Sequence, residues 1–132
     1  MRRESLDTNT LLRLVLQDVP EQSKLVQELL KSSRVRFFVS DVALTEFVYV
    51  LGSHYGFNRS QIKMTAESLL SLKAIDCNRE LTYTALNLFV THKSLSYEDC
   101  YLASSAKSMN AAPLWTFDRA LAAKAESAQL LA

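Results

Sequence analysis

Short runs of β-favouring residues alternate along this chain with longer stretches of helical periodicity, and no other feature narrows the possible folds as much. The β-favouring runs are Glu4 to Leu6, Val35 to Val39, Ala74 to Cys77, Leu114 to Thr116 and Gln129 to Leu131. Such alternation favours a parallel sheet with helices on both of its faces. The length of 132 residues is that of one ordinary domain, and no repeat or linker interrupts it. We therefore expect residues 1–132 to fold as a single α/β domain.

Capping residues predict where several helices begin and end. Pro20 is typical of a first helical turn. Ser40 is expected to open a helix that runs through Leu51. Ser96 is expected to open another, which ends near Asn110 because asparagine tolerates the left-handed cap conformation. These positions place the polar residues discussed below at the ends of strands and the starts of helices.

Composition excludes several classes of function. The only glycines are Gly52 and Gly56, too few for the loops that bind phosphate in Rossmann folds and P-loops. No apolar stretch approaches the about 20 residues of a membrane span, and the basic first residues are not followed by the apolar region of a signal peptide. We expect a cytoplasmic protein without membrane contact, whose Cys77 and Cys100 are buried reduced thiols. The net charge of +1 gives no general attraction to nucleic acid, so RNA binding would need local patches or bound metal.

Four acidic residues stand at positions where a carboxylate is informative. They are Asp7, Glu46, Asp99 and Asp118. Asp7 and Asp118 each follow a predicted strand, and Asp99 is the acid of a Ser-x-x-acid capping box. All three have a structural alternative, because such residues cap the orphan N–H groups of a first helical turn. Glu46 lies in the apolar segment 42–51, where we expect burial on more than one face, and an exposed helix face is its alternative.

The order of these acids along the chain is more informative than any one of them. Residues that follow parallel strands share the carboxyl edge of the sheet, where doubly wound folds place their ligands. Four carboxylates at that edge would repel one another and have raised pKa values unless cations neutralise them. Oxygen-only ligands favour Mg²⁺ or Mn²⁺ over zinc. Such a metal suits phosphodiester hydrolysis, because it lowers the pKa of a bound water and stabilises charge on the leaving oxygen.

With these residues in place, the sequence resembles the PIN-domain nucleases, most closely the small single-domain VapC toxins of type II toxin–antitoxin modules. The matching segments are Leu6-Asp7-Thr8-Asn9, Ser40, Leu44-Thr45-Glu46, Ser96-Tyr97-Glu98-Asp99 and Thr116-Phe117-Asp118. They follow the family's order and span the chain. The charged first strand and Asn110, near a position where the family often has glycine, depart from the pattern without touching the acids.

The resemblance implies a three-layer α/β/α sandwich with a mostly parallel sheet of four or five strands. It also implies an endoribonuclease that depends on Mg²⁺ or Mn²⁺, a homodimer, and neutralisation by a cognate antitoxin protein. The family's catalytic and metal-binding acids correspond to Asp7, Glu46, Asp99 and Asp118. Its supporting polar residues correspond to Thr8, Asn9 and Thr116. Such supporting residues orient metal ligands or water.

Contacts to RNA and to partner proteins are expected near these motifs. Basic residues close to the acids are the candidates for phosphate contacts: Arg13, Lys107 and Arg119. An antitoxin helix or a second protomer needs exposed apolar surface, for which the candidates are Phe47, Tyr49, Tyr55 and Phe57. A core position explains Phe47 equally well, whereas the tyrosines carry a hydroxyl that suits a wet interface.

Other functions fit the sequence less closely. A phospho-acceptor receiver domain needs an acidic pair after its first strand, where Asp7 stands alone, and a lysine after a late strand, which Thr116 lacks. A phosphatase of the haloacid dehalogenase type needs a second aspartate where Asn9 stands. Two alternatives stay open. One is a PIN nuclease of RNA processing that has no antitoxin, and the other is an inactive PIN-fold module that binds RNA or protein.

Overall fold

The computed structural model describes residues 1–132, which divide into two compact units, Met1–Cys77 and Asn78–Ala132. Seven helices connect five strands, and every strand pair is parallel. The strands are hydrogen-bonded as a three-stranded sheet in the first unit and a two-stranded sheet in the second. The parallel α/β class predicted from the alternation of strands and helices is therefore confirmed.

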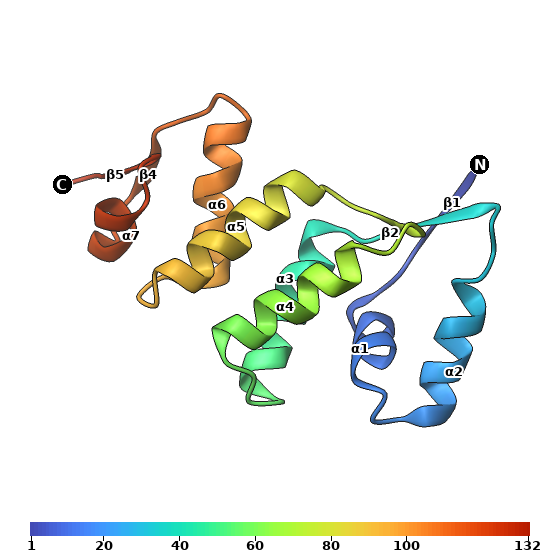
Figure 1. Ribbon diagram of the computed structural model, residues 1–132. Helices are drawn as coiled ribbons and strands as arrows, with labels where there is room; N and C mark the ends of the chain where they lie inside the picture. The colour runs from blue at the N-terminus through green and yellow to red at the C-terminus, as the bar shows by residue number, and fades with distance from the viewer. The chain divides into compact units, whose positions relative to one another are not determined.

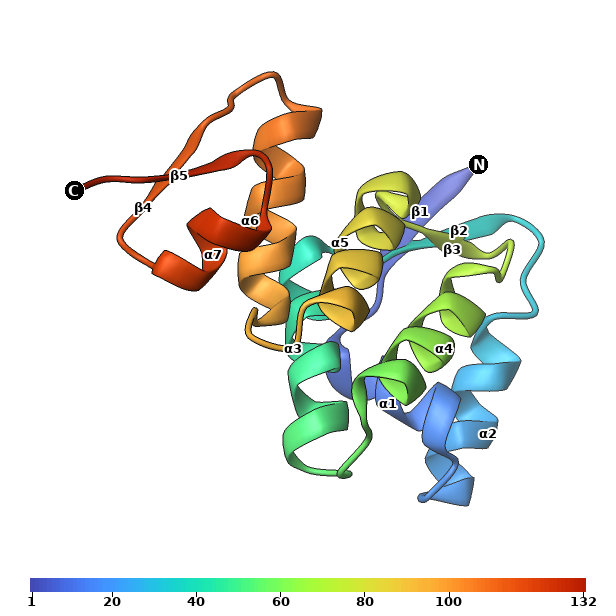
Figure 2. The ribbon, with the colours of Figure 1, turned by 60° about the vertical axis from the view of Figure 1, so that its left-hand side comes forward.

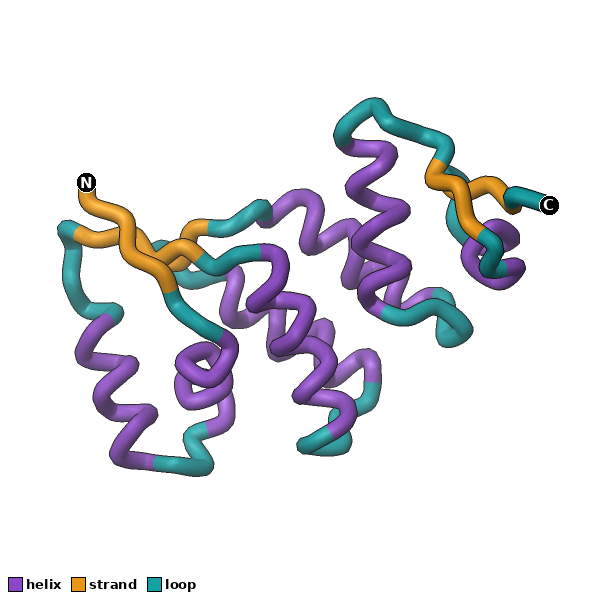
Figure 3. Tube along the Cα trace, turned by 180° about the vertical axis from the view of Figure 1, so that it is seen from behind, coloured by secondary structure: helices purple, strands orange, loops and turns teal.

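The first unit builds a sheet of order β1-β2-β3. Its strands are β1 (Arg2–Ser5), β2 (Val35–Phe38) and β3 (Ile75–Asp76). Helices α1 (Thr8–Leu16) and α2 (Pro20–Leu29) link β1 to β2, and α3 (Asp41–Ser53) and α4 (Arg59–Leu70) link β2 to β3 (Figure 1). Parallel strands need such crossover connections. Figure 3 shows the three strands gathered together, with the helices running away from them.

The helix starts of this unit follow the sequence closely. The Asp7 side chain caps α1, and the Ser40 hydroxyl caps α3 by accepting the Ala43 N–H at 3.1 Å. Pro20 is the first residue of α2, where its missing N–H costs no helical hydrogen bond. These predicted helix starts are confirmed, and two of the caps place their side chains at the carboxyl ends of β1 and β2.

A continuous apolar core holds the sheet and helices of this unit together. Helix α1 packs against α2 and α3, and α3 also packs against α4 (Figure 2). Phe37 of β2, Leu11 of α1 and Phe47 of α3 are each 1% exposed or less. Phe47 therefore belongs to the core and does not line a partner groove.

The charged composition of β1 is compatible with its edge position in this sheet. The Arg3 guanidinium donates to Asp76 at 2.9 Å and lies 4.9 Å from the centroid of the Phe38 ring. Phe38 belongs to the neighbouring strand β2 and Asp76 to β3 beyond it, so this exposed arginine covers apolar surface while its charge is paired.

The second unit contains three helices and a two-stranded parallel sheet. Its elements are α5 (Arg79–Thr91), α6 (Tyr97–Ser108), β4 (Leu114–Thr116), α7 (Arg119–Lys124) and β5 (Ala128–Leu130). Helices α5 and α6 pack side by side (Figure 2). The rings of Phe89 and Tyr97 lie edge to face, with their centroids 5.9 Å apart. Asn110, just beyond α6, has a φ of 55°, as the predicted left-handed ending requires.

Two further expectations concern buried cysteines and membranes. Cys100 is buried, whereas Cys77 is only half-buried, so burial is confirmed for one cysteine and is partial for the other. None of the helices combines the length and the apolar character that crossing a membrane requires.

Candidate active site

A polar pocket lies at the carboxyl edge of the three-stranded sheet. It has a volume of about 540 Å³ and contains both acids that the sequence predicts for this half of the chain. The segment after β1 contributes Asp7, Thr8 and Asn9, while Ser40 follows β2 and Glu46 projects from α3. Strands β1 and β2 are parallel, so the segments that follow them meet at one edge. This is the edge at which the sequence predicts a ligand site.

The Asp7 carboxylate is held in place by its capping role. Its Oδ1 accepts hydrogen bonds from the Thr10 backbone N–H at 2.9 Å and from the Thr10 hydroxyl at 2.8 Å. These bonds lower the pKa of Asp7 below its ordinary value of 3.8. The expectation of a raised pKa is thus wrong for this residue, because local hydrogen bonds to the charged form outweigh the desolvation that would raise the pKa. Both capping bonds are accepted by Oδ1, and the carboxylate also lines the pocket.

Glu46 lies on an exposed part of α3, so the predicted burial of its side chain is wrong. The apolar neighbours Phe47 and Val48 turn into the core, at 0% and 4% exposure, while Glu46 turns outward to the pocket. One helical position changes the direction of a side chain by about 100°, so adjacent residues can differ completely in burial. Exposure removes the desolvation cost that made this glutamate unusual in the sequence.

Thr8 links the two acids of the pocket. This buried residue directly follows Asp7, and its Oγ1 lies 3.1 Å from the Ala43 carbonyl oxygen and 3.3 Å from Glu46 Oε2. A hydroxyl has one hydrogen to donate, so the two acceptors on α3 share or alternate it. Thr8 thereby ties the start of α1 to α3 and restrains the Glu46 carboxylate.

The residues of this pocket fit a hard divalent cation better than zinc. The structure contains no group of three or more His, Cys, Asp or Glu side chains placed to hold a metal ion. Two carboxylates do border the pocket, together with the neutral oxygens of Thr8, Asn9 and Ser40. Magnesium in enzymes is commonly bound through one or two carboxylates, with water and substrate phosphate completing its shell. The donor set of the first unit is compatible with that pattern.

The second unit carries the other two predicted acids. The Asp118 side chain caps α7 by accepting the Leu121 N–H at 3.0 Å, and the Asp118 N–H donates to the Thr116 hydroxyl at 3.0 Å. Asp99 lies in the first turn of α6 and donates its N–H to the Ser96 hydroxyl at 3.1 Å. The side-chain carboxylate of Asp99 is half-buried and takes no part in that bond. The meeting of these acids with Asp7 and Glu46 in one site stays a prediction.

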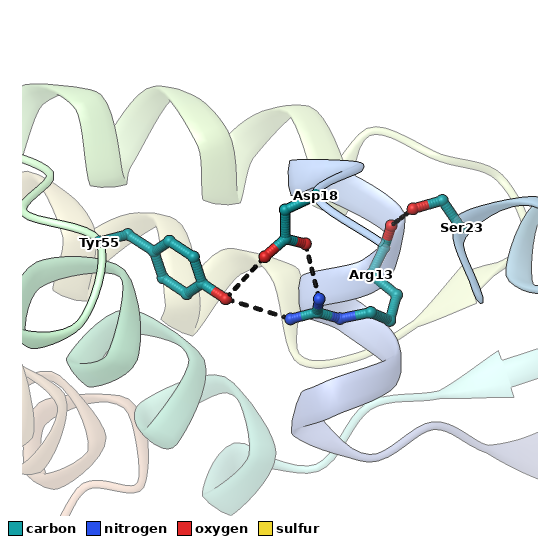
Figure 4. Close-up of polar contacts among 4 residues, drawn as sticks. All are labelled: Arg13, Asp18, Ser23 and Tyr55. Carbon is teal, nitrogen blue, oxygen red and sulfur yellow. Dashed lines mark hydrogen bonds and ion pairs between the residues drawn. The ribbon is translucent and has the colours of Figure 1, made fainter. Parts of the chain in front are cut away.

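Arg13 has protein partners in the structure, although the sequence suggests it for phosphate. Its guanidinium donates to Asp18 at 2.6 Å and to the Tyr55 hydroxyl at 3.2 Å, and Tyr55 donates to Asp18 at 3.0 Å (Figure 4). The Arg13 carbonyl also accepts the Ser23 hydroxyl at 2.6 Å. The Arg13 side chain is only 14% exposed. This cluster fastens the chain after α3 to the connection between α1 and α2.

The cluster gives a prediction for the dependence of stability on pH. Desolvation tends to raise the pKa of Asp18, but hydrogen bonds from Tyr55 and Arg13 outweigh it and lower the pKa below 3.8. The charged Asp18 therefore stabilises the fold above that value, and its contribution is lost as the pH falls through the lowered pKa. We expect Asp18→Asn to melt below the wild type at pH 7, with the difference vanishing in strong acid. Melting curves from pH 2 to pH 7 test this, and a constant difference would contradict it.

The other predicted basic and aromatic residues are exposed to different degrees. Lys107 near the end of α6 and Arg119 at the start of α7 are both exposed. Tyr49 is 64% exposed, whereas Tyr55 is 36% exposed and uses its hydroxyl within the Arg13 cluster. Phe57 is half-buried. Tyr49 thus has the most accessible ring among the predicted partner contacts.

Some features of the site were not predicted from the sequence. Ser5 lines the pocket as the last residue of β1, and its position at a strand end is the signal that would have found it. The partnership between Arg13 and Tyr55 joins residues 42 positions apart, and no local pattern predicts it.

Comparison with models of known families identifies the family of this chain. The model of the PIN domain matches residues 5–127, which covers nearly the whole chain and both compact units. No curated protein matches the sequence. PIN domains are generally nucleases that typically use divalent metal ions, and the family suggests RNA binding. Because the family model extends from β1 to the residue before β5, this chain belongs to the PIN domain family.

Proposed function

We propose that this chain is an endoribonuclease that cleaves RNA phosphodiester bonds with the help of Mg²⁺ or Mn²⁺. The observation that carries the proposal is the polar pocket in which Asp7 and Glu46 meet at the carboxyl edge of the sheet. Both residues occupy positions expected of PIN-domain acids, and the chain belongs to that family. The family model spans both compact units, which supports one PIN domain over residues 1–132.

Four carboxylates are proposed to hold the metal. They are Asp7, Glu46, Asp99 and Asp118. When bound, the metal supplies a water of lowered pKa and stabilises negative charge on the leaving oxygen. Capping hydrogen bonds keep Asp7 ionised and fix its orientation, and Thr8 restrains Glu46. The hydroxyl of Thr116 orients the backbone that leads into Asp118, while Asn9 lines the pocket with a neutral oxygen.

RNA phosphates are proposed to contact Lys107 and Arg119. Both side chains are exposed. Lys107 lies on α6, the helix that carries Asp99, and Arg119 directly follows Asp118. Arg13 is assigned a structural role instead, since Asp18 already pairs its charge. Phosphate contacts of this kind position a nucleic acid without reading its sequence.

We further propose that the nuclease is a VapC-type toxin of the cytoplasm that acts as a homodimer and is silenced by an antitoxin protein. The proposed antitoxin site is a pocket of about 380 Å³ between α1 and α4. It suits an apolar partner because side chains such as Leu14, Val15 and Met64 line it. Met64 is 70% exposed, and so is available to an amphipathic helix laid along α4. Tyr49 is the proposed contact for the second protomer.

Cleavage of a mixed-structure RNA pool tests the proposed activity. We expect the wild type to cut with Mg²⁺ or Mn²⁺, to stop cutting in EDTA, and to resume when metal is restored. Glu46→Gln and Asp99→Asn should lose at least about 100-fold in rate, since each removes a charged ligand. Glu21→Gln is the matched control, because it makes the same change on an exposed helix position outside the pocket. Metal-independent cutting, or full activity of Glu46→Gln, would contradict the proposal.

The result also separates the two alternatives that the sequence leaves open. A protein that binds RNA but cuts nothing with either metal would be the inactive PIN-fold module. A protein that cuts but forms no complex with any protein encoded beside it would be a processing nuclease without an antitoxin. Co-expression with the neighbouring reading frame, followed by size-exclusion chromatography, distinguishes these cases.

Thr8 gives a second prediction for the same site. Thr8→Val keeps the shape of the side chain but removes the hydroxyl that reaches Glu46 at 3.3 Å. We expect cleavage to fall by about 10-fold to 100-fold, the usual effect of losing a residue that orients a metal ligand. Thr8→Ser retains the hydroxyl and should keep most of the rate. Equal rates for both variants, with unchanged melting temperatures, would remove Thr8 from the site.

A further inference from the structure

A second pocket of the first unit lies at the opposite edge of the sheet from the acids. Its volume is about 690 Å³, larger than that of the acidic pocket. At the amino ends of the strands, the pocket is lined by Val35, which is the first residue of β2, and by Ala74, which lies just before β3. Leu14, Leu30 and Leu72 add aliphatic side chains from the surrounding helices and connections. None of the residues that line the acidic pocket takes part in it.

The charges around this second pocket are all positive. Lys31, Arg36 and Lys73 line it, and no aspartate or glutamate does. Lys31 pairs with Glu28 at 2.9 Å, but both side chains of that pair are more than half exposed, so the pair is weak. A mostly aliphatic cavity bordered by cations is complementary to a molecule with an apolar body and one negative end.

Arg36 is the cation of this pocket that has a buried donor without a hydrogen-bond partner. Its neighbour across the sheet is Arg3, and the two strands place these like charges side by side. Arg3 has Asp76 as an acidic partner, whereas Arg36 has only one long bond, from Nη2 to the Ile75 carbonyl oxygen at 3.4 Å. The buried Nε of Arg36 has no hydrogen-bond partner. A buried donor without an acceptor is uncommon in native proteins and calls for an explanation, of which a bound water or ion is one.

We infer that this pocket binds an amphipathic carboxylate, with its aliphatic chain among the leucines and its carboxylate at Arg36. A guanidinium offers two parallel N–H donors that match a carboxylate, so the ligand would add strong acceptors to a guanidinium that has a single long hydrogen bond in the structure. The volume falls within the usual range of small-molecule sites. The lining contains no tryptophan, tyrosine or phenylalanine on which a nucleobase would stack, which favours an aliphatic ligand over a nucleotide.

Calorimetric titration with decanoate, kept below its critical micelle concentration, tests the inference. We expect saturable binding to one site and binding at least about tenfold weaker for decanol, which lacks the charge. Arg36→Met keeps an apolar stem but removes the guanidinium, and it should weaken decanoate binding at least about tenfold without affecting decanol. Arg34→Met is the matched control, since Arg34 is exposed and does not line the pocket. Ala74→Phe fills the cavity and should weaken both probes.

The outcomes separate this site from the nuclease and from non-specific binding. Glu46→Gln should bind decanoate like the wild type, whatever its effect on RNA cleavage. Melting curves must show that Arg36→Met and Ala74→Phe are folded. The methyl chemical shifts of Leu30 and Val35, which line this pocket but not the groove between α1 and α4, should move with decanoate. The inference is overturned if decanoate does not bind, if decanol binds equally well, or if folded Arg36→Met binds decanoate as tightly as Arg34→Met. Shifts confined to the groove between α1 and α4 would also overturn it.

Discussion

Asp7→Asn is expected to abolish metal-dependent RNA cleavage while leaving the stability of the fold almost unchanged. The side chain of Asp7 has two tasks, since its Oδ1 caps α1 through Thr10 and its carboxylate also lines the pocket. Asparagine caps a helix about as well as aspartate, so the capping task survives. The negative charge that a metal requires is lost, and we expect the rate to fall by at least about 100-fold.

Asp7→Ala provides the comparison, because it removes both tasks at once. Alanine removes both the charge and the cap, so we expect the same loss of cleavage together with a loss of about 1 kcal/mol in the free energy of unfolding. Single-turnover cleavage assays and urea unfolding of the two variants check the pair of results. An active Asp7→Asn variant, or one that unfolds as readily as Asp7→Ala, would contradict the metal-binding role and leave Asp7 with a capping role alone.

Phe47→Ala is expected to have the largest effect on stability. Phe47 is 0% exposed on α3, the helix that carries Glu46, and α3 packs against both α1 and α4. Removing a fully buried ring loses its transfer free energy and leaves a cavity, which together cost about 3–5 kcal/mol. Most domains of this size are stable by about 5–15 kcal/mol, so the variant should be close to the limit of folding.

Denaturant unfolding of Phe47→Ala beside Tyr49→Ala provides the measurement and its control. Tyr49 lies two residues further along the same helix but is 64% exposed, and its removal should change stability by no more than about 0.5 kcal/mol. Similar losses for both variants would contradict the packing of α3. A large loss for Tyr49→Ala alone would indicate that its ring is covered in solution by another chain.

The local features of the fold could be predicted from the sequence because they depend on residues only a few positions apart. Asp7, Ser40 and Asp118 cap helices at the positions expected of them, and the strands lie where the β-favouring runs predict within one or two residues. A capping bond joins a side chain to an N–H three residues later, so a short segment contains the whole interaction. Asp7 beside β1 could be found in the same way, whereas Glu46 on α3 was singled out by its apolar neighbours.

Side-chain directions and distant partners were decided only by the tertiary structure. The apolar segment around Glu46 predicts burial, yet the packing of α3 places Phe47 inside and Glu46 outside. Arg13 lies close to the Asp7 motif in sequence. In the structure its guanidinium pairs with the Asp18 carboxylate and donates a hydrogen bond to the Tyr55 hydroxyl. The sequence by itself determined the parallel α/β class and the helix starts, and it supplied the candidate acids. Burial, ion pairing and the shape of both pockets were decided by contacts between remote elements, because these energies depend on which surfaces meet in space.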